Sequence, residues 1–134
     1  MQKIDDFDPE MDKKATILAR KKRFSAELKR LNKIFAHVDP KRFHAVEALI
    51  QTAADLRVRI EEARQDIDEN GYVEAFQQKQ DFQAYERERP VVKRLNAMEK
   101  NLITVIKELV SYLPKEVQET ISDGFDEFVA TKPR

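Results

Sequence analysis

Two apolar stripes with helical spacing constrain the fold of this chain more than any other feature. The first stripe advances in steps of three or four residues through Val46, Leu49, Ala53, Leu56, Ile60, Ala63 and Ile67. The second advances in the same way through Leu95, Met98, Leu102, Val105, Leu109 and Tyr112. Residues three or four positions apart lie on one face of an α-helix. The stripes therefore predict two long helices, each of which needs an apolar surface to pack against.

The composition agrees with an all-α fold. The 134 residues include only two glycines and no tryptophan, and 37% of them are charged, a profile typical of long-helix and coiled-coil proteins. The length suggests one domain. The absence of cysteine excludes disulfides, thiolate metal sites and thiol nucleophiles. Because the sequence has neither an apolar run of membrane-spanning length nor the apolar core of a signal peptide, we expect a soluble, cytoplasmic protein.

Proline and glycine mark the ends of the predicted helices. Asp8-Pro9 and Asp39-Pro40 each combine a capping side chain with a proline suited to the first helical turn. Asn70-Gly71 predicts a helix end, and Pro90 predicts a new start. We thus expect helices from Pro9 to about residue 36, from Pro40 to about residue 69, from 90 to 113, and from 114 to about 121. The predicted organisation is an acidic segment at 1–12, a basic helix at 13–38, a helical hairpin at 39–113, and a short helix with an acidic tail at 114–134.

The connector between the two striped helices has no single predicted conformation. Residues 72–89 place five large side chains among glutamine, glutamate and arginine. A short β-hairpin with strands at 72–76 and 82–85 fits this pattern, and so does a packed loop or a helical extension. The sequence leaves the three alternatives open.

Charge is strongly segregated although the net charge is zero. Residues 1–12 carry five acids against one lysine, residues 13–33 carry nine bases against one acid, and residues 116–134 carry five acids against two bases. Nine bases on about six helical turns can neutralise several phosphates, so the basic helix is the candidate DNA-binding element. The alternative is a solvated helix face, and no helix-turn-helix pattern assigns base readout. The candidate DNA-binding residues are Lys13, Lys14, Arg20, Lys21, Lys22, Arg23, Lys29, Arg30 and Lys33.

The apolar stripes favour self-assembly, although an antiparallel pair within one chain could bury both of them. Phe43, Ile50 and Val58 form a second apolar flank off the first stripe, and a monomer would leave part of this flank exposed to water. We therefore expect an oligomer, assembled through its long helices. The candidate oligomerisation residues are Phe43, Val46, Leu49, Ile50, Leu56, Ile60, Leu95, Leu102 and Leu109.

The acidic end of the chain contains two aromatic residues in the sequence Asp123-Gly124-Phe125-Asp126-Glu127-Phe128. Phe125 and Phe128 could anchor such a segment on a partner while Asp126 and Glu127 steer it toward a basic groove. A frayed terminus is the alternative. We interpret this tail as a partner-binding segment, which could also fold back on the basic helix.

Catalytic and metal-binding motifs are weak, and neither a cofactor nor an enzymatic activity is expected. His37 and His44 flank a helix start, where a capping or surface role is the simpler interpretation. The carboxylates between Glu61 and Glu69 could suggest a metal-dependent nuclease. However, arginines lie among them along the same helix, so local ion pairing is the preferred interpretation.

The order of these segments resembles a known family. The segments are AADLRVRIEEA (residues 53–63), ENGYV (69–73), RPVVKRLNAMEKNLITVIKEL (89–109) and LPKE (113–116). In this order and spacing they resemble the small subunit of tailed-phage terminases over roughly residues 40–129, and the DGFDEFV tail (123–129) is also similar. The segment after Pro114 lacks the short arginine-bearing end of many relatives.

The resemblance implies a non-catalytic packaging factor with a predominantly helical fold that assembles into a ring. Such a protein recognises double-stranded phage DNA at the packaging start site in the host cytoplasm. It then delivers the DNA to the large terminase subunit, which carries the ATPase and the nuclease. An oligomeric helical adaptor that binds only proteins is the alternative from another functional class.

Overall fold

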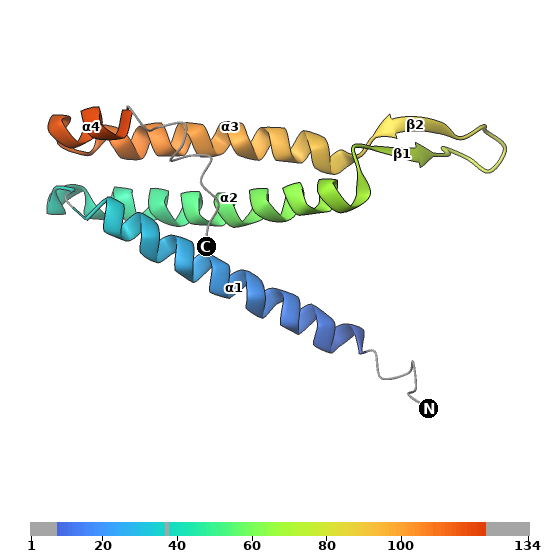
Figure 1. The fold of residues 1–134 in the computed structure, drawn as a ribbon, viewed down its shortest axis with the longest axis horizontal. Helices are drawn as coiled ribbons and strands as arrows, with labels where there is room; N and C mark the ends of the chain where they lie inside the picture. Colours follow the sequence, from blue (N-terminus) through green and yellow to red (C-terminus); the bar gives the residue numbers. More distant parts are fainter. Residues whose placement is uncertain (1–7, 37, 123–134) are drawn as a thin grey trace.

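The computed structural model describes residues 8–36 and 38–122, and the side chains of these residues up to 119. The long helices of this part of the chain are α1 (Pro9–Ile34), α2 (Phe43–Asn70) and α3 (Pro90–Ser111), and Figure 1 shows their arrangement. A 3-10 turn, η2 (Pro40–Arg42), leads into α2, and a short helix, α4 (Lys115–Ser122), follows α3. Strands β1 (Val73–Phe76) and β2 (Tyr85–Glu88) connect α2 with α3. The predicted helical fold class is confirmed, with one small two-stranded sheet added to it.

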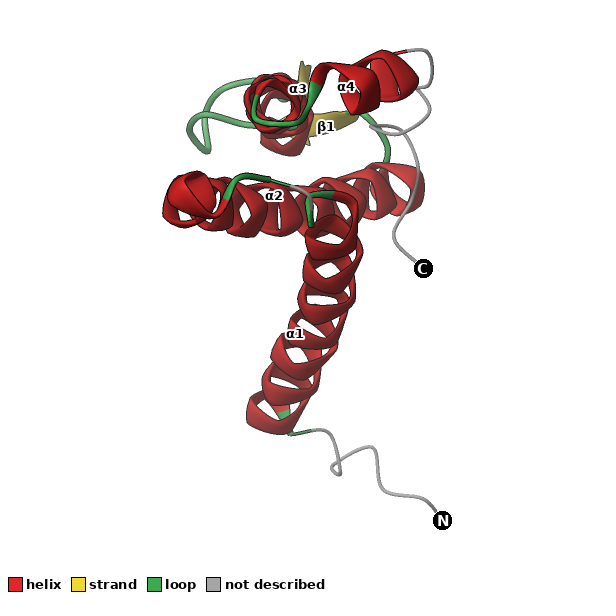
Figure 2. Cartoon of the chain, turned by 90° about the vertical axis from the view of Figure 1, so that its left-hand side faces the viewer, coloured by secondary structure: helices red, strands yellow, loops and turns green. Residues whose placement is uncertain are grey.

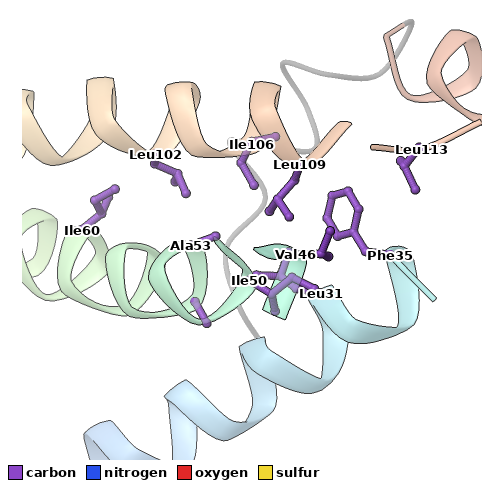
Figure 3. Close-up of a cluster of buried hydrophobic side chains, with 11 residues drawn as sticks. Leu31, Phe35, Val46, Ile50, Ala53, Ile60, Leu102, Ile106, Leu109 and Leu113 are labelled. Atoms are coloured by element: carbon purple, nitrogen blue, oxygen red, sulfur yellow. The ribbon is translucent and has the colours of Figure 1, made fainter. Parts of the chain in front are cut away.

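Helices α2 and α3 lie side by side and run antiparallel (Figure 1). Their apolar stripes pack into one core. Figure 3 shows Leu102, Ile106 and Leu109 of α3 above Ala53 and Ile60 of α2. Most of the residues predicted to join separate copies therefore pack inside one chain, which is the alternative that the sequence left open. Val46, Ile50, Ile60, Leu102 and Leu109 are buried, while Leu49, Leu56 and Leu95 pack partly buried against the core.

Helix α1 packs on a different face of α2 from α3. Figure 2 shows it leaving the α2–α3 layer at a steep angle, so that its C-terminal half contacts α2 and its N-terminal half projects away. Leu31 and Phe35 enter the core, with exposed fractions of 0% and 3%. The flank that was expected to stay exposed in a monomer is largely covered, because Ile50 and Val58 are buried. Only Phe43 of that flank stays 57% exposed, so the flank no longer argues for assembly.

The predicted helix starts have the expected chemistry. The Asp8 carboxylate accepts a hydrogen bond from the backbone N–H of Glu10 at 2.9 Å, and Asp39 accepts one from Lys41 at 3.1 Å. These bonds satisfy amide protons that have no acceptor in the first turn of a helix. The helix start at Pro9 is confirmed. At Pro40 the chain first makes the turn η2, and regular α-helix begins three residues later.

The connector is a β-hairpin, one of the three conformations left open. Val73 pairs with Glu88 and Phe76 pairs with Tyr85 in an antiparallel register. The second strand begins three residues later than the interval 82–85 expected for it. The Gln77 side chain explains this shift, since its amide donates to the carbonyls of Gln80 and Phe82 at 2.9 and 2.7 Å and holds the intervening residues as a loop.

Gly71 separates α2 from the hairpin with a backbone geometry that favours glycine. Its φ of 85° and ψ of −178° place it in a region that is essentially restricted to glycine, beyond the left-handed region that asparagine tolerates. Arg89 secures the other side of this junction. Its guanidinium donates to the Gly71 carbonyl at 2.9 Å and to the Asp66 carboxylate at 2.8 Å. The hairpin is therefore anchored at its base to the end of α2.

Candidate nucleic-acid interface

The nine predicted DNA-binding residues divide into three arginines with internal partners and six exposed lysines. Arg20 binds the Glu62 carboxylate of α2 through Nε at 2.6 Å and Nη2 at 2.9 Å, and Arg23 reaches the same carboxylate at 3.4 Å. Arg30 binds Glu27, one helical turn before it, with Nε at 3.1 Å from a carboxylate oxygen. Arg20 and Arg23 thus help to hold α1 on α2, whereas this Arg30 contact lies within α1.

A buried charge cluster lies where α1 crosses α2. The Glu27 side chain is completely buried, and the Nε atom of Arg57 on α2 lies 3.4 Å from its Oε1 atom. Burial lowers the pKa of Arg57, and the nearby Glu27 carboxylate opposes that shift. A buried ion pair restricts the arrangements that two helices can adopt, because any other packing would leave one charge without its partner. Glu27 and Arg57 therefore fix α1 in its crossing position.

The six lysines all lie on the exposed surface of α1. No ion pair joins any of them to another residue within 8–36 and 38–119, the residues whose side chains are described. These exposed lysines are Lys13, Lys14, Lys21, Lys22, Lys29 and Lys33. Their ammonium groups are therefore available to a polyanion, whereas the arginines would have to give up internal carboxylates.

Three of the lysines form one row along the helix. Lys22, Lys29 and Lys33 are separated by seven and four residues, so they lie on one stripe. At 100° per residue this stripe is opposite Leu31, the buried centre of the packing face. We call Lys22, Lys29 and Lys33 the lysine row; it spans about 16 Å at the usual helical rise. A straight row of this kind can contact successive phosphates of one nucleic acid backbone.

The row provides phosphate contacts and no means of reading a base sequence. Lysine is a compact point charge, and sequence is read mainly by side chains that form directional bonds with base edges. The arginines that could form bidentate bonds with guanine are held by Glu62 and Glu27. The arrangement supports electrostatic, salt-sensitive binding of a nucleic acid backbone.

The Arg20–Glu62 pair predicts a small pH-dependent contribution to stability. Hydrogen bonds from Arg20 lower the pKa of Glu62, while partial burial opposes the shift. Because the pKa is lower in the folded state than in the unfolded chain, this stabilisation is complete above the ordinary glutamate pKa of about 4.3 and disappears as the pH falls through the folded value. We expect Glu62→Gln to cost about 0.5–1 kcal/mol at neutral pH, the range of a partly exposed ion pair.

Urea unfolding at pH 7, 5 and 3 would measure this effect. The difference in free energy of unfolding between wild type and Glu62→Gln should narrow toward pH 3. Glu108→Gln, at an exposed position on α3, is the matched control and should change little at any of these pH values. A Glu62→Gln difference that stays constant across the series would contradict the role of the ionised carboxylate.

The candidate catalytic and metal-binding residues lie in ion pairs or on the surface. The carboxylates between Glu61 and Glu69 were expected to pair with arginines on their own helix. The pair of Arg59 with Asp55, at 2.9 Å, is local to α2 but lies outside that set. Asp66 pairs with Arg89, which follows the hairpin. Glu62 instead pairs with α1. No group of three or more potential metal ligands occurs in the part of the chain that the structure describes. His44 lies on the surface, with its ring edge-to-face against Phe43 at 6.2 Å.

Two predictions fall on residues that the structure does not cover. His37 and the acidic tail with Phe125, Asp126, Glu127 and Phe128 lie outside the described residues. Conversely, a second set of exposed lysines lies on α3 and was not among the predicted site residues, namely Lys93, Lys100 and Lys107. Their regular spacing of seven residues was the signal that could have revealed them.

Among the described residues, no helix is both long and apolar enough to cross a bilayer. In comparisons with known proteins, no family model, curated protein or solved structure matched the chain.

Proposed function

We propose that this chain is the small, non-catalytic subunit of a phage terminase. In this role it would bind double-stranded phage DNA in the host cytoplasm, associate with copies of itself in a ring, and deliver the DNA to the large terminase subunit. The family assignment rests on the sequence resemblance over residues 40–129. The DNA-binding part rests on the lysine row of α1.

One contrast supports DNA binding most directly. The arginines of α1 bind carboxylates of the same chain, whereas Lys22, Lys29 and Lys33 lie on the side of the helix opposite its packing face. A lysine needed for folding would be expected to bind an acid, as the arginines do. A row of cations with no acid beside it attracts polyanions and releases counterions on contact. The buried Glu27–Arg57 pair holds this row on the outside of the molecule.

Charge reversal of the lysine row tests the proposal. We expect Lys22→Glu, Lys29→Glu and Lys33→Glu together to weaken binding of a short DNA duplex by about 10²-fold at 0.1 M salt. Loss of three phosphate contacts should also reduce the slope of log affinity against log salt by about 2.7, since each contact contributes about 0.9. Fluorescence anisotropy across a salt series measures both quantities.

The α3 lysines provide a control with the same change in charge. Lys93→Glu, Lys100→Glu and Lys107→Glu together alter the net charge equally. They lie on α3, which is on the side of α2 away from α1 (Figure 2). We expect a weaker effect, limited to the general loss of positive charge. Equal losses from both variants would contradict a site on α1. A wild-type protein without salt-sensitive DNA binding would instead favour the helical adaptor that binds only proteins.

A further inference from the structure

The β-hairpin has one face that is acidic and exposed. Partners in the register share a face, so Val73, Ala75, Glu86 and Glu88 lie together. All four side chains are exposed, and Val73 retains 55% of its accessible surface. The opposite face contains the internal contacts: Arg87 pairs with Glu74 and stacks 3.5 Å from the centre of the neighbouring aromatic ring at position 76. We call Val73, Ala75, Glu86 and Glu88 the acidic hairpin face.

The acids of this face have no partner among the residues with described side chains, 8–36 and 38–119. Neither Glu86 nor Glu88 takes part in an ion pair there. Two like charges beside exposed Val73 gain nothing from packing. An isolated two-stranded hairpin is marginally stable in water, so a surface that covers this face would stabilise it. A surface that complements this face would be basic and aliphatic.

Residues 9–19 of α1 carry two acids, Glu10 and Asp12, beside two lysines, but one side of this helix has the complementary composition. At 100° per residue, Lys13 and Lys14 lie on that side and Asp12 lies on the other. Residues 9–19 are exposed throughout, because this part of the helix projects beyond α2 (Figure 2). Met11, Ile17 and Leu18 are 68%, 41% and 57% exposed, and Lys13 and Lys14 lie between them. A helical segment of eleven residues is itself marginally stable without tertiary contacts. We call residues 11–18 the projecting segment of α1.

These two surfaces cannot meet within one chain. Figure 1 shows the hairpin extending from the end of the α2–α3 pair, while the start of α1 lies well away from it, beyond the opposite side of α2. The buried Glu27–Arg57 pair holds α1 in that crossing position. A second copy can place its projecting segment on the hairpin of the first copy. The hairpin of the second copy then remains free to bind the projecting segment of a third copy.

We propose that the acidic hairpin face binds the projecting segment of α1 from a second copy of this chain. Lysines 13 and 14 then face glutamates 86 and 88, and the aliphatic residues of α1 cover Val73 and Ala75. The contact is head-to-tail, because it joins two different surfaces. A repeated head-to-tail contact closes into a ring when its rotation permits and otherwise gives an open filament. The inference deepens the self-association in the proposed function, and it does not depend on DNA binding.

Two charge-reversal variants of the full chain test the contact. In the first, Glu86→Lys and Glu88→Lys make the hairpin basic; in the second, Lys13→Glu and Lys14→Glu make the projecting segment acidic. We expect each variant alone to lose assembly, because like charges then face each other across every contact. An equimolar mixture should recover assembly, since every hairpin can then meet a projecting segment of opposite charge on the other variant. Light scattering coupled to size-exclusion chromatography measures the mass, and circular dichroism verifies folding.

Glu108→Lys with Glu119→Lys is the matched control, because it makes the same change in charge at exposed positions outside the proposed contact. This variant should assemble as wild type does. If the hairpin variant assembles as the wild-type protein does, the inference is overturned. It is also overturned if the mixture of the two variants stays monomeric. The variant with Lys22, Lys29 and Lys33 changed to glutamate distinguishes failure of this contact from failure of the proposed DNA binding. It should assemble normally while losing DNA affinity, so the two proposals can fail independently.

Discussion

Replacing Glu27 with leucine should destabilise the protein by about 3–5 kcal/mol. Arg57 would then remain in the interface between α1 and α2 without the carboxylate that compensates its buried charge. The side chain of Arg57 is only 6% exposed, so water cannot replace the lost partner without rearrangement of the helices. Arg30 would lose the same carboxylate, but its 29% exposure allows it to be hydrated. Urea unfolding followed by circular dichroism measures the change in free energy.

The double variant Glu27→Leu with Arg57→Met distinguishes the cost of an orphaned charge from the value of the pair itself. Replacement of a whole buried ion pair by apolar residues of similar volume is often neutral or stabilising. We therefore expect the double variant to recover most of the stability that Glu27→Leu loses. If both variants are equally destabilised, the effect comes from altered packing, and the charge cluster does not fix α1 as we infer.

Leu109→Ala should cost about 3–4 kcal/mol, within the range for leucines truncated in a well-packed core. Leu109 is completely buried, and Figure 3 shows it pointing from α3 toward α2 and the end of α1. The substitution removes apolar contacts and leaves a cavity that three helices would have to close. Urea unfolding at neutral pH measures the loss in the same way as for Glu27.

Ile103→Ala on the same helix is the control for Leu109→Ala. Ile103 is 37% exposed, so its truncation leaves a surface depression that water can fill. We expect a cost below about 1 kcal/mol. Comparable losses at positions 103 and 109 would contradict a core centred between α2 and α3.

Local chemistry made the element boundaries predictable. Asp8-Pro9, Gly71 and Pro90 act within one or two turns of the backbone, so their effects are visible in a short stretch of sequence. The predicted end of α2 and the predicted start of α3 are therefore close to the observed residues, Asn70 and Pro90. The connector was harder to predict, because the Gln77 side chain reaches two backbone carbonyls and sets the loop length that positions the second strand.

Long-range pairing was not predictable in the same way. The sequence favoured local partners for the charges of α2, yet Glu62 pairs with Arg20 of α1, which is 42 residues away, and Arg64 pairs with Glu99 of α3. The candidate DNA-binding set had the same difficulty. From the sequence, Arg20 and Lys22 are equivalent cations of one basic helix. Only the position of α2 shows that Arg20 binds Glu62 within the chain and that Lys22 stays exposed.

The sequence by itself determined which segments are helical, where they begin and end to within one helical turn, and which face of each is apolar. These properties follow from the 3.6-residue period and from capping, and both are local. The tertiary structure decided which helix covers each of these apolar faces. Ile50 packs in one cluster with Leu31 and Phe35 from the end of α1, α3 buries the main stripe of α2, and the lysine row is left outside. The physical reason is that burial depends on the relative position of whole helices, and a stripe in the sequence does not specify its partner.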